Sequence, residues 1–257
     1  MSGADDIAFA HRLADAAGNA IRPFFRSAFQ TERKGDRSPV TEADRAAERA
    51  MRDLIEAERP DDGILGEEFG ATNMGAARRW VLDPIDGTVS FMAGRPIFGT
   101  LVALLEDGWP VLGIIDQPIA GERWTARTGQ DATLNGLPAR TRHCSDLKTA
   151  ALATSAPHYF NDEDGARFVA LARQADPAAL IYGGDCYNYG LLASGHIDLV
   201  VETGLKLHDF AALVPIIEAA GGMMCDWAGD PLNADSAGDV LALGDPARLE
   251  DVLEILN

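Results

Sequence analysis

Residues 80–91 read WVLDPIDGTVSF, which places two carboxylates three positions apart at the end of an apolar run. The apolar run predicts a buried strand that ends at Asp83, a position from which ligand-binding groups often project. Pro84 and Gly87 favour turns, so we expect the chain to reverse here and to bring Asp83 and Asp86 together. The segment therefore predicts a strand end that presents two acids to one point.

Two carboxylates this close together are explained either by a metal site or by a hydrogen-bonded turn. They strongly disfavour joint ionisation unless cations lie between them. Magnesium accepts carboxylate, carbonyl and water oxygens, and the carbonyl of Ile85 would point to the same place. An Asp-Pro-x-Asp-Gly turn held by its own side-chain hydrogen bonds explains Asp83 and Asp86 equally well. On this segment alone, metal binding and turn formation both stay open.

Two further acidic positions fit a metal site. Glu67 follows the short apolar run Ile64-Leu65, again at a predicted strand end, although an exposed acidic loop would look the same. Asp209 lies immediately before an apolar-periodic helix, so it could be that helix's N-cap. As a ligand it would bring a carboxylate from the second half of the chain to a site built by the first. The site would then lie in the crevice between the halves.

Asp44 and Thr88 form the other informative pair. Thr41-x-x-Asp44 fits a capping box, which predicts a structural role for Asp44 at a helix start. A threonine hydroxyl held by a carboxylate can instead orient and deprotonate a water molecule. Gly87 and Thr88 also offer successive backbone N–H groups for phosphate oxygens. The sequence does not choose between a cap and a proton relay for Asp44.

The first half of the chain, about residues 1–145, has the pattern of helices that cover a largely antiparallel sheet. An apolar stripe at spacings of three and four runs from Ile7 to Phe25, with Pro23 expected to kink or end the helix early. Residues 32–39 (ERKGDRSP) read as a loop, and a second helix is expected from Thr41 to Pro60. Residues 98–118 contain two apolar runs around Glu-Asp-Gly, which predicts a hairpin.

The second half, about residues 146–257, alternates apolar strands (ALATS, ALIYG, HIDLVVE) with helical stretches. This pattern predicts an α/β layer. Because no repeat, low-complexity tract or Pro/Ser-rich linker separates the halves, we expect one domain over residues 1–257, with the second half supplying Asp209. The fold class is therefore predicted as α/β (α+β).

Composition excludes several functions. The net charge of −18 repels nucleic acid and anionic membranes, and no stretch is long and apolar enough to span a membrane, so we expect a cytoplasmic protein. The three cysteines form no CxxC pair, and the five histidines lack zinc-site spacing and are expected to be ordinary surface or packed residues. A phosphorylated substrate would be repelled too, unless bound cations neutralise the acids.

Taken in order, Glu67, the run from Asp83 to Thr88 (DPIDGT), Asp209, Pro215 and Gly221-Gly222 resemble the inositol monophosphatase superfamily of magnesium-dependent phosphatases. The resemblance extends from SPVTEAD to the EAAGG segment, nearly the whole chain. It implies a layered αβαβα sandwich, usually dimeric, that hydrolyses a small phosphate monoester. The implied cofactor is Mg²⁺, two or three ions per site.

The resemblance also implies residue roles. Glu67, Asp83 and the Ile85 carbonyl would hold one ion, and Asp83, Asp86 and Asp209 would hold a second. Gly87 and Thr88 would bind phosphate. Glu67, Thr88 and Asp44 would be the catalytic group that activates water. A lysine near the phosphate would be Lys34 or, alternatively, Arg37.

Three stretches look most similar to the histidinol-phosphate phosphatase branch: FGTLVALLEDGWPVLGIIDQPIAGERW, GGDCYNYGLLASGHIDLVVE and GLKLHDFAALVPIIEAAGG. His208 stands where inositol-specific members usually have Trp, and Val89 departs from the lysine common in the branch. Asp185 and Glu202 are expected near the organic part of the substrate, because acids suit the amine and imidazole of histidinol phosphate. Glu202 also matches a polyol-contacting position in inositol-specific relatives.

Other functions remain as alternatives. Inositol 1-phosphate or another small phosphate monoester would need the same metal site. Aspartyl phosphatases use Asp-x-Asp with the first acid as nucleophile, whereas the spacing here is Asp-x-x-Asp with proline after the first acid. A non-catalytic scaffold usually lacks a ligand, yet all the acids and Thr88 are present. Metal-dependent catalysis is the prediction.

Overall fold

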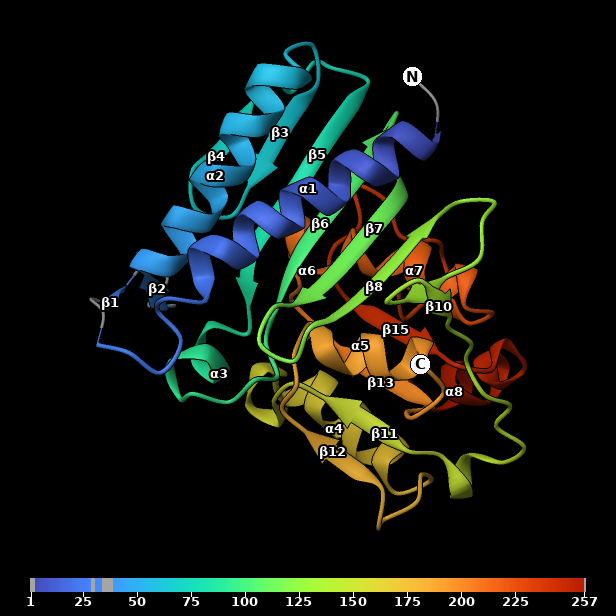
Figure 1. Ribbon diagram of the computed structural model, residues 1–257. Helices are drawn as coiled ribbons and strands as arrows, with labels where there is room; N and C mark the ends of the chain where they lie inside the picture. The colour runs from blue at the N-terminus through green and yellow to red at the C-terminus, as the bar shows by residue number, and fades with distance from the viewer. Residues whose placement is uncertain (1–2, 29–30, 34–38, 257) are drawn as a thin grey trace.

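The structure is a computed structural model that describes residues 3–28, 31–33 and 39–256. Helices and sheets alternate in five layers (Figure 1). Two helices cover one face of a large sheet, a second helical layer lies between that sheet and a smaller one, and two more helices cover the outer face of the smaller sheet. This confirms the predicted αβαβα sandwich.

The large sheet has eight strands in the order β10-β9-β8-β7-β6-β5-β3-β4, and every pair except β3 with β5 is antiparallel. The predicted hairpin is confirmed as β6 and β7, joined by Asp107 and Gly108, which both have positive φ angles. The strands are β3 (Gly63–Gly66), β4 (Gly70–Thr72), β5 (Arg78–Asp86), β6 (Gly99–Glu106), β7 (Trp109–Gln117), β8 (Glu122–Arg127), β9 (Thr133–Leu134) and β10 (Leu137–Pro138).

Helices α1 (Gly3–Ile21) and α2 (Glu42–Glu58) lie on the outer face of this sheet (Figure 1). The apolar stripe of α1 packs with Trp80 and Leu82, whose side chains point from β5 toward the helices. Helix α1 ends two residues before Pro23, as expected for a residue that cannot continue the hydrogen-bond ladder. Helix α2 ends at Glu58, two residues before Pro60, which confirms both predicted helices.

The stretch expected to be a loop at residues 32–39 is in part a strand. Strand β1 (Thr31–Arg33) pairs antiparallel with β2 (Pro39–Thr41). The prediction was therefore wrong at Glu32 and Pro39, because pairing between two short segments gives extended structure that local composition does not reveal. Lys34 and Arg37, the two candidates for a phosphate-contacting cation, lie outside the described residues.

The smaller sheet has the strand order β12-β11-β13-β15-β14, with β11 parallel to β12 and β13 and the other pairs antiparallel. Its strands are β11 (Leu152–Thr154), β12 (Leu180–Tyr182), β13 (Leu199–Glu202), β14 (Met223–Cys225) and β15 (Val240–Leu243). The three strands expected in this half are β11, β12 and β13. Alternate residues of β13 pack on opposite sides of the sheet: Val200 faces the inner helices, and Leu199 and Val201 face the outer ones.

The remaining helices fill the layers around the smaller sheet. Helices α5 and α7 pack between the two sheets, while α4 and α8 cover the outer face. Their bounds are α3 (Thr88–Met92), α4 (Asp162–Ala172), α5 (Cys186–Ala193), α6 (Leu207–Phe210), α7 (Leu213–Ala219) and α8 (Leu249–Leu256), with short 3₁₀ helices at Leu147–Thr149, Pro157–Tyr159 and Pro246–Arg248. Among the described residues, no helix combines the length and apolar character that crossing a membrane requires.

Candidate active site

The acidic segment from Asp83 to Asp86 continues strand β5 instead of following its end. The strand runs to Asp86, so the expected chain reversal at Pro84 was wrong, and the chain turns at Gly87, whose φ is 88°. Asp83 pairs with Leu101 and Asp86 pairs with Gly99 on β6, so three steps on one strand match two on the other. This is a β-bulge, and the hydroxyl of Thr100 donates to the Pro84 carbonyl across it at 2.8 Å.

The bulge explains how both acids reach the same side of the sheet. In a regular strand, residues three apart point to opposite faces. Here the extra residue restores a common face, because Ile85 packs with Trp80 and Leu82 under the outer helices while Asp83 and Asp86 approach Asp209. The bulge thus directs two carboxylates into the layer between the sheets.

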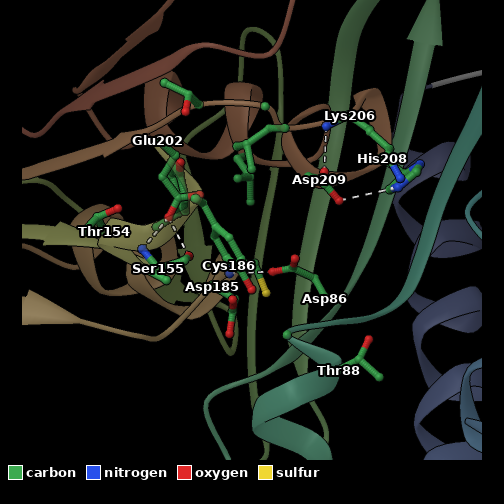
Figure 2. Close-up of a pocket in the computed structure, with 18 of the residues that line it drawn as sticks. Asp86, Thr88, Thr154, Ser155, Asp185, Cys186, Glu202, Lys206, His208 and Asp209 are labelled. Carbon is green, nitrogen blue, oxygen red and sulfur yellow. Dashed lines mark hydrogen bonds and ion pairs between the residues drawn. The ribbon is translucent and has the colours of Figure 1, made fainter. Parts of the chain in front are cut away.

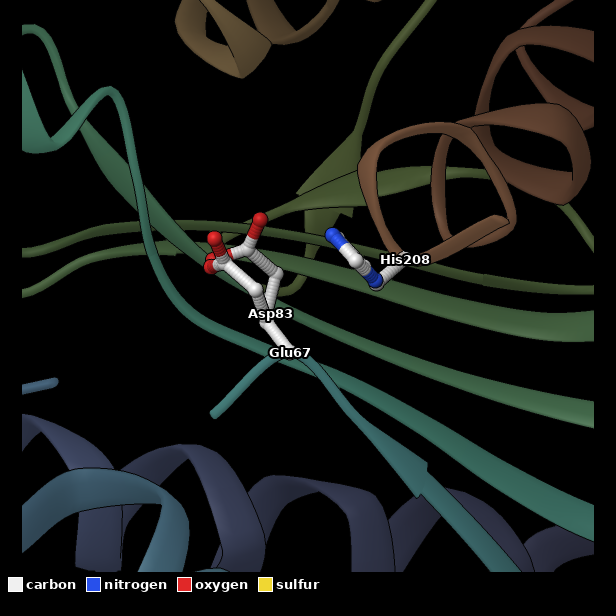
Figure 3. A group of neighbouring side chains, drawn as sticks. All are labelled: Glu67, Asp83 and His208. Carbon is white, nitrogen blue, oxygen red and sulfur yellow. The ribbon is translucent and has the colours of Figure 1, made fainter. Parts of the chain in front are cut away.

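The acids form two clusters that share Asp83. Ligand atoms of Glu67, Asp83 and His208 lie within 4.8 Å of one another, and so do those of Asp83, Asp86 and Asp209. Figure 3 shows the first cluster, with Glu67 leaving the end of β3, Asp83 on β5, and His208 on α6 facing both. Elements from both halves of the chain therefore meet at the carboxylate of Asp83.

Burial without a cation makes this cluster electrostatically unfavourable. Desolvation, with the charges of Glu67, Asp86 and Asp209, raises the pKa of Asp83 well above its usual value. Desolvation and the charge of Asp185 likewise raise the pKa of Asp86. Within the described part of the chain, Asp83 Oδ1 is buried and has no hydrogen-bond partner. A hard divalent cation would neutralise the carboxylates and occupy this oxygen, so these residues fit Mg²⁺.

Asp209 reaches the site from a short helix and not from an N-cap. It is the third residue of α6, and its carboxylate accepts a hydrogen bond from the backbone N–H of Lys206 at 2.6 Å. The alternative of an N-cap position is therefore wrong, although the residue does serve the helix start through a capping box. Its second oxygen, Oδ1, lies 3.5 Å from Nε2 of His208 and remains directed at the site.

Asp44 forms the capping box and still has one carboxylate oxygen available. Its Oδ2 accepts from the backbone N–H of Thr41 at 2.8 Å and from the Thr41 hydroxyl at 2.5 Å. Its Oδ1 is buried without a hydrogen-bond partner among the described residues. Burial, with a contribution from the charge of Glu67, raises the pKa of Asp44 to about 6. The hydroxyl of Thr88 donates to the Ile85 carbonyl at 3.1 Å, so the two residues do not hydrogen-bond to each other here.

Gly87 lies where no larger residue fits. A Cβ at this position would lie 2.6 Å from Oδ2 of Asp185. Asp185 itself adopts φ 45°, an unusual conformation for a non-glycine residue, immediately before α5. The backbone N–H of the next residue, Cys186, donates to Asp86 at 2.5 Å, which ties the start of α5 to the acidic segment.

A pocket of about 450 Å³ opens over these acids. Figure 2 shows Thr88, Asp86, Asp209 and His208 on one side, with Glu202 and Ser155 on the other. The pocket is lined by Glu67, Asp86, Gly87, Thr88, Val89, Thr154, Ser155, Ala156, Tyr159, Phe160, Asp185, Cys186, Tyr189, Glu202, Thr203, Gly204, Leu205, Lys206, His208, Asp209 and Leu213. Both acids expected near the organic part of a substrate, Asp185 and Glu202, therefore line it.

Glu202 ends β13 and is held by Ser155. The Ser155 backbone N–H and hydroxyl donate to one Glu202 oxygen at 2.9 and 2.5 Å. Burial raises the pKa of Glu202 to about 7. Because Asp185, whose pKa burial also raises, lines the same pocket, this end of it carries two acids that a cationic ligand would stabilise in the charged form.

Sequence reasoning missed several residues of the pocket. His208 was expected to be an ordinary histidine, yet it belongs to the first acidic cluster, and its position next to Asp209 was the only local signal. Ser155 follows β11 and Tyr159 ends the short 3₁₀ helix Pro157–Tyr159, and neither segment carries a motif. Lys206 brings a cation to the pocket lining from the residue before α6.

Comparisons with known proteins give the site its context. The model of the inositol monophosphatase family matches residues 4–255. The chain is 47% identical to the "Bifunctional phosphatase IMPL2, chloroplastic" of Arabidopsis thaliana over 97% of this chain and 74% of that protein. It is 38% identical to a histidinol-phosphatase of Chlorobaculum parvum, over 92% of each chain.

A solved structure of an inositol monophosphatase from Zymomonas mobilis superposes with a TM-score of 0.91 and 52% identity, over 100% of this chain and 99% of that one. The members of this family are metal-dependent phosphatases, typically with Mg²⁺. A match across almost the whole length, together with the acidic clusters at the centre of the fold, leads to one conclusion. This protein belongs to the inositol monophosphatase family and is a metal-dependent phosphatase.

Proposed function

We propose that this phosphatase hydrolyses histidinol phosphate to histidinol and phosphate, a step of histidine biosynthesis. The observation that carries the proposal is a pair of acids, the half-buried Asp185 and the buried Glu202, that line the pocket beside the metal-binding cluster. An amine or imidazolium placed there would compensate charges that burial otherwise disfavours. Relatives named as histidinol-phosphatases, at 35% to 38% identity, support the same substrate.

Two sets of ligands would hold the two ions. Glu67, Asp83 and the carbonyl of Ile85 would hold one Mg²⁺, and Asp83, Asp86 and Asp209 would hold another. When bound, such ions supply Lewis-acid activation of water and stabilise charge on the phosphate oxygens. Shared use of Asp83 by both ligand sets is supported by its membership of both clusters.

The protein's own groups would position the reactants. The backbone N–H groups of Gly87 and Thr88, at the start of α3, would bind phosphate oxygens. The Thr88 hydroxyl would turn from the Ile85 carbonyl toward the attacking water, with its proton accepted by the free Oδ1 of Asp44. Glu67, which lines the pocket, would orient the same water. No phosphorylated side chain is needed.

Inositol 1-phosphate is the second candidate, and one observation favours it. The Zymomonas mobilis structure, named as an inositol monophosphatase, is 52% identical to this chain. Carboxylates such as Glu202 accept hydrogen bonds from polyol hydroxyls as readily as they pair with an amine. Glu202 alone therefore does not distinguish the two substrates.

The test compares phosphate release from histidinol phosphate and from inositol 1-phosphate, each with and without Mg²⁺. We expect kcat/KM to be higher for histidinol phosphate, and Asp185→Asn to lower it more for this substrate than for the neutral polyol. Asp83→Asn should abolish turnover of both, because it removes a ligand from both clusters. The matched control is Asp53→Asn, which removes an exposed carboxylate on α2.

The possible outcomes test the substrate assignment and the metal-site assignment separately. A preference for inositol 1-phosphate would discard the histidinol assignment and keep the metal site. Substantial turnover by Asp83→Asn would overturn the shared-ligand assignment itself.

The further expectations from the sequence stay predictions. These are a homodimer, two or three ions per site, a cytoplasmic location, and a single domain with its internal boundary near residue 145. Light scattering of the purified protein tests the dimer, and metal analysis after equilibration with Mg²⁺ tests the ion count.

A further inference from the structure

His208 lies at the acidic cluster with only 9% of its surface exposed. It is the second residue of α6, immediately before Asp209, and its ring extends toward Glu67 and Asp83 (Figure 3). These three side chains each offer one ligand atom within 4.8 Å of the others. An imidazole in this position lies among ligands that are otherwise all oxygen atoms.

The spacing is close to what one ion requires. Metal–nitrogen and metal–oxygen bonds of about 2.1 Å allow two ligands of the same ion to be at most about 4.2 Å apart. The cluster lies within 4.8 Å before any ion draws it together. A movement of about half an ångström, within the reach of a χ rotation, would therefore bring all three groups onto one ion.

The other contact of His208 does not use up its ligand capacity. Its Nε2 lies 3.5 Å from Oδ1 of Asp209, which is an ion-pair distance and not a hydrogen bond. A neutral imidazole has one nitrogen with a free lone pair and one N–H. One nitrogen can bind a metal while the other donates to a neighbouring carboxylate, an arrangement common for metal-bound histidines.

We propose that His208 supplies a nitrogen ligand to the ion held by Glu67 and Asp83. The inference rests on the ion site proposed above, and it deepens that proposal by naming the class of ion this position favours. Imidazole suits borderline transition ions, whereas all-oxygen sites suit Mg²⁺. The position therefore accepts Zn²⁺ or Co²⁺ more readily than a site of the same acids without His208.

The direct test is electron spin-echo spectroscopy of the protein loaded with Mn²⁺ in place of Mg²⁺. We expect modulation from a directly bound ¹⁴N nucleus in the wild type and its loss in His208→Gln. The matched control is His143→Gln, which removes an exposed histidine paired with Asp245 and should leave the nitrogen signal unchanged. Bound Mn²⁺ without nitrogen modulation in the wild type would overturn the inference, as would modulation that survives in His208→Gln.

A second measurement separates ligation from a purely structural role. By calorimetry, His208→Gln should weaken Zn²⁺ binding by about tenfold or more and Mg²⁺ binding by less than about threefold. If His208 only orients Asp209, both ions should lose affinity equally, and that result would contradict ligation. The wild-type spectrum decides the question even if the variant folds poorly.

The failure of this inference is distinguishable from failure of the proposed function. Mn²⁺ that binds without nitrogen modulation leaves the carboxylate site intact and removes only His208. Absence of bound Mn²⁺ in the wild type, with Asp83→Asn as the reference, would overturn both. The substrate comparison is independent, because it is measured with Mg²⁺.

Discussion

Glu202 shows how a single buried acid can link pH to stability. Burial raises its pKa to about 7 from an ordinary value of 4.5, even though Ser155 donates two hydrogen bonds to it. The folded protein thus binds this proton more tightly than the unfolded chain does. The contribution of protonated Glu202 to the free energy of unfolding is fully present below pH 4.5 and is lost as the pH rises through about 7.

We therefore expect Glu202→Gln to flatten the pH dependence of stability. The neutral amide keeps an acceptor for Ser155 but cannot ionise. Between about pH 4.5 and 7, the wild type should lose on the order of 3 kcal/mol more than the variant, in chelator and with urea as the denaturant. Parallel pH profiles for the two proteins would show that Glu202 titrates normally.

Position 87 requires glycine because of its backbone conformation and because of its contact with Asp185. Its φ is 88°, and an added Cβ would approach Asp185 to 2.6 Å. We expect Gly87→Ala to cost more than the about 1–2 kcal/mol of left-handed backbone strain and to reduce kcat/KM by at least about tenfold. Gly121→Ala is the matched control, since Gly121 has φ 71° with nothing within 4 Å, so it isolates the strain. Equal effects of the two substitutions on stability and activity would contradict the contact with Asp185.

At the scale of elements, the bulge in β5 is the feature that assembles the acids. It places Asp83 and Asp86 on one face, and the hydrogen bond from Thr100 to the Pro84 carbonyl spans it at 2.8 Å. Because the site depends on this local geometry, a small change in β6 should affect activity without touching any acid.

Thr100→Val tests that dependence. It keeps the side-chain shape but leaves the buried Pro84 carbonyl without its donor, which should cost about 1–3 kcal/mol and lower kcat/KM by about tenfold. Thr125→Val is the control, because the buried hydroxyl of Thr125 has no hydrogen-bond partner in the described part of the chain. Full activity of Thr100→Val, measured at saturating Mg²⁺, would show that the bulge holds without this bond.

At the scale of the whole molecule, the candidate site joins the two sheets. Glu67, Asp83 and Asp86 come from the large sheet, while Asp209 comes from α6, which follows the strand β13 of the small sheet. Cations that bind all four carboxylates would bind only the folded state, because the unfolded chain does not bring them together.

We therefore expect Mg²⁺ to stabilise the protein. At a concentration of 100 times Kd, one ion should add about 2.7 kcal/mol and raise Tm by several degrees, an effect that chelator reverses. Asp209→Asn should remove most of this shift, since it takes away the ligand that the second half supplies. A Tm that is independent of Mg²⁺ in the wild type would argue against a site of this kind.

Much of the architecture could be predicted because its signals are local. The apolar stripes of α1 and α2, the capping box at Thr41, and the β6–β7 hairpin follow from side-chain period and turn chemistry. The order of the acidic motifs pointed to the family, and the comparisons confirm it. The roles of the individual site residues stay predictions, although the structure gathers the acids as those predictions require.

The sequence by itself determined helices α1 and α2 and the β6–β7 hairpin, because helical and strand periods and turn residues act over a few positions. Only the tertiary structure decided that β5 continues through Pro84 to Asp86, that Asp209 lies inside α6, and that His208 joins Glu67 and Asp83. Each of these depends on pairing or packing between segments far apart in the chain. Such contacts are set by the register of strands and the docking of helices, which no local pattern of residues encodes.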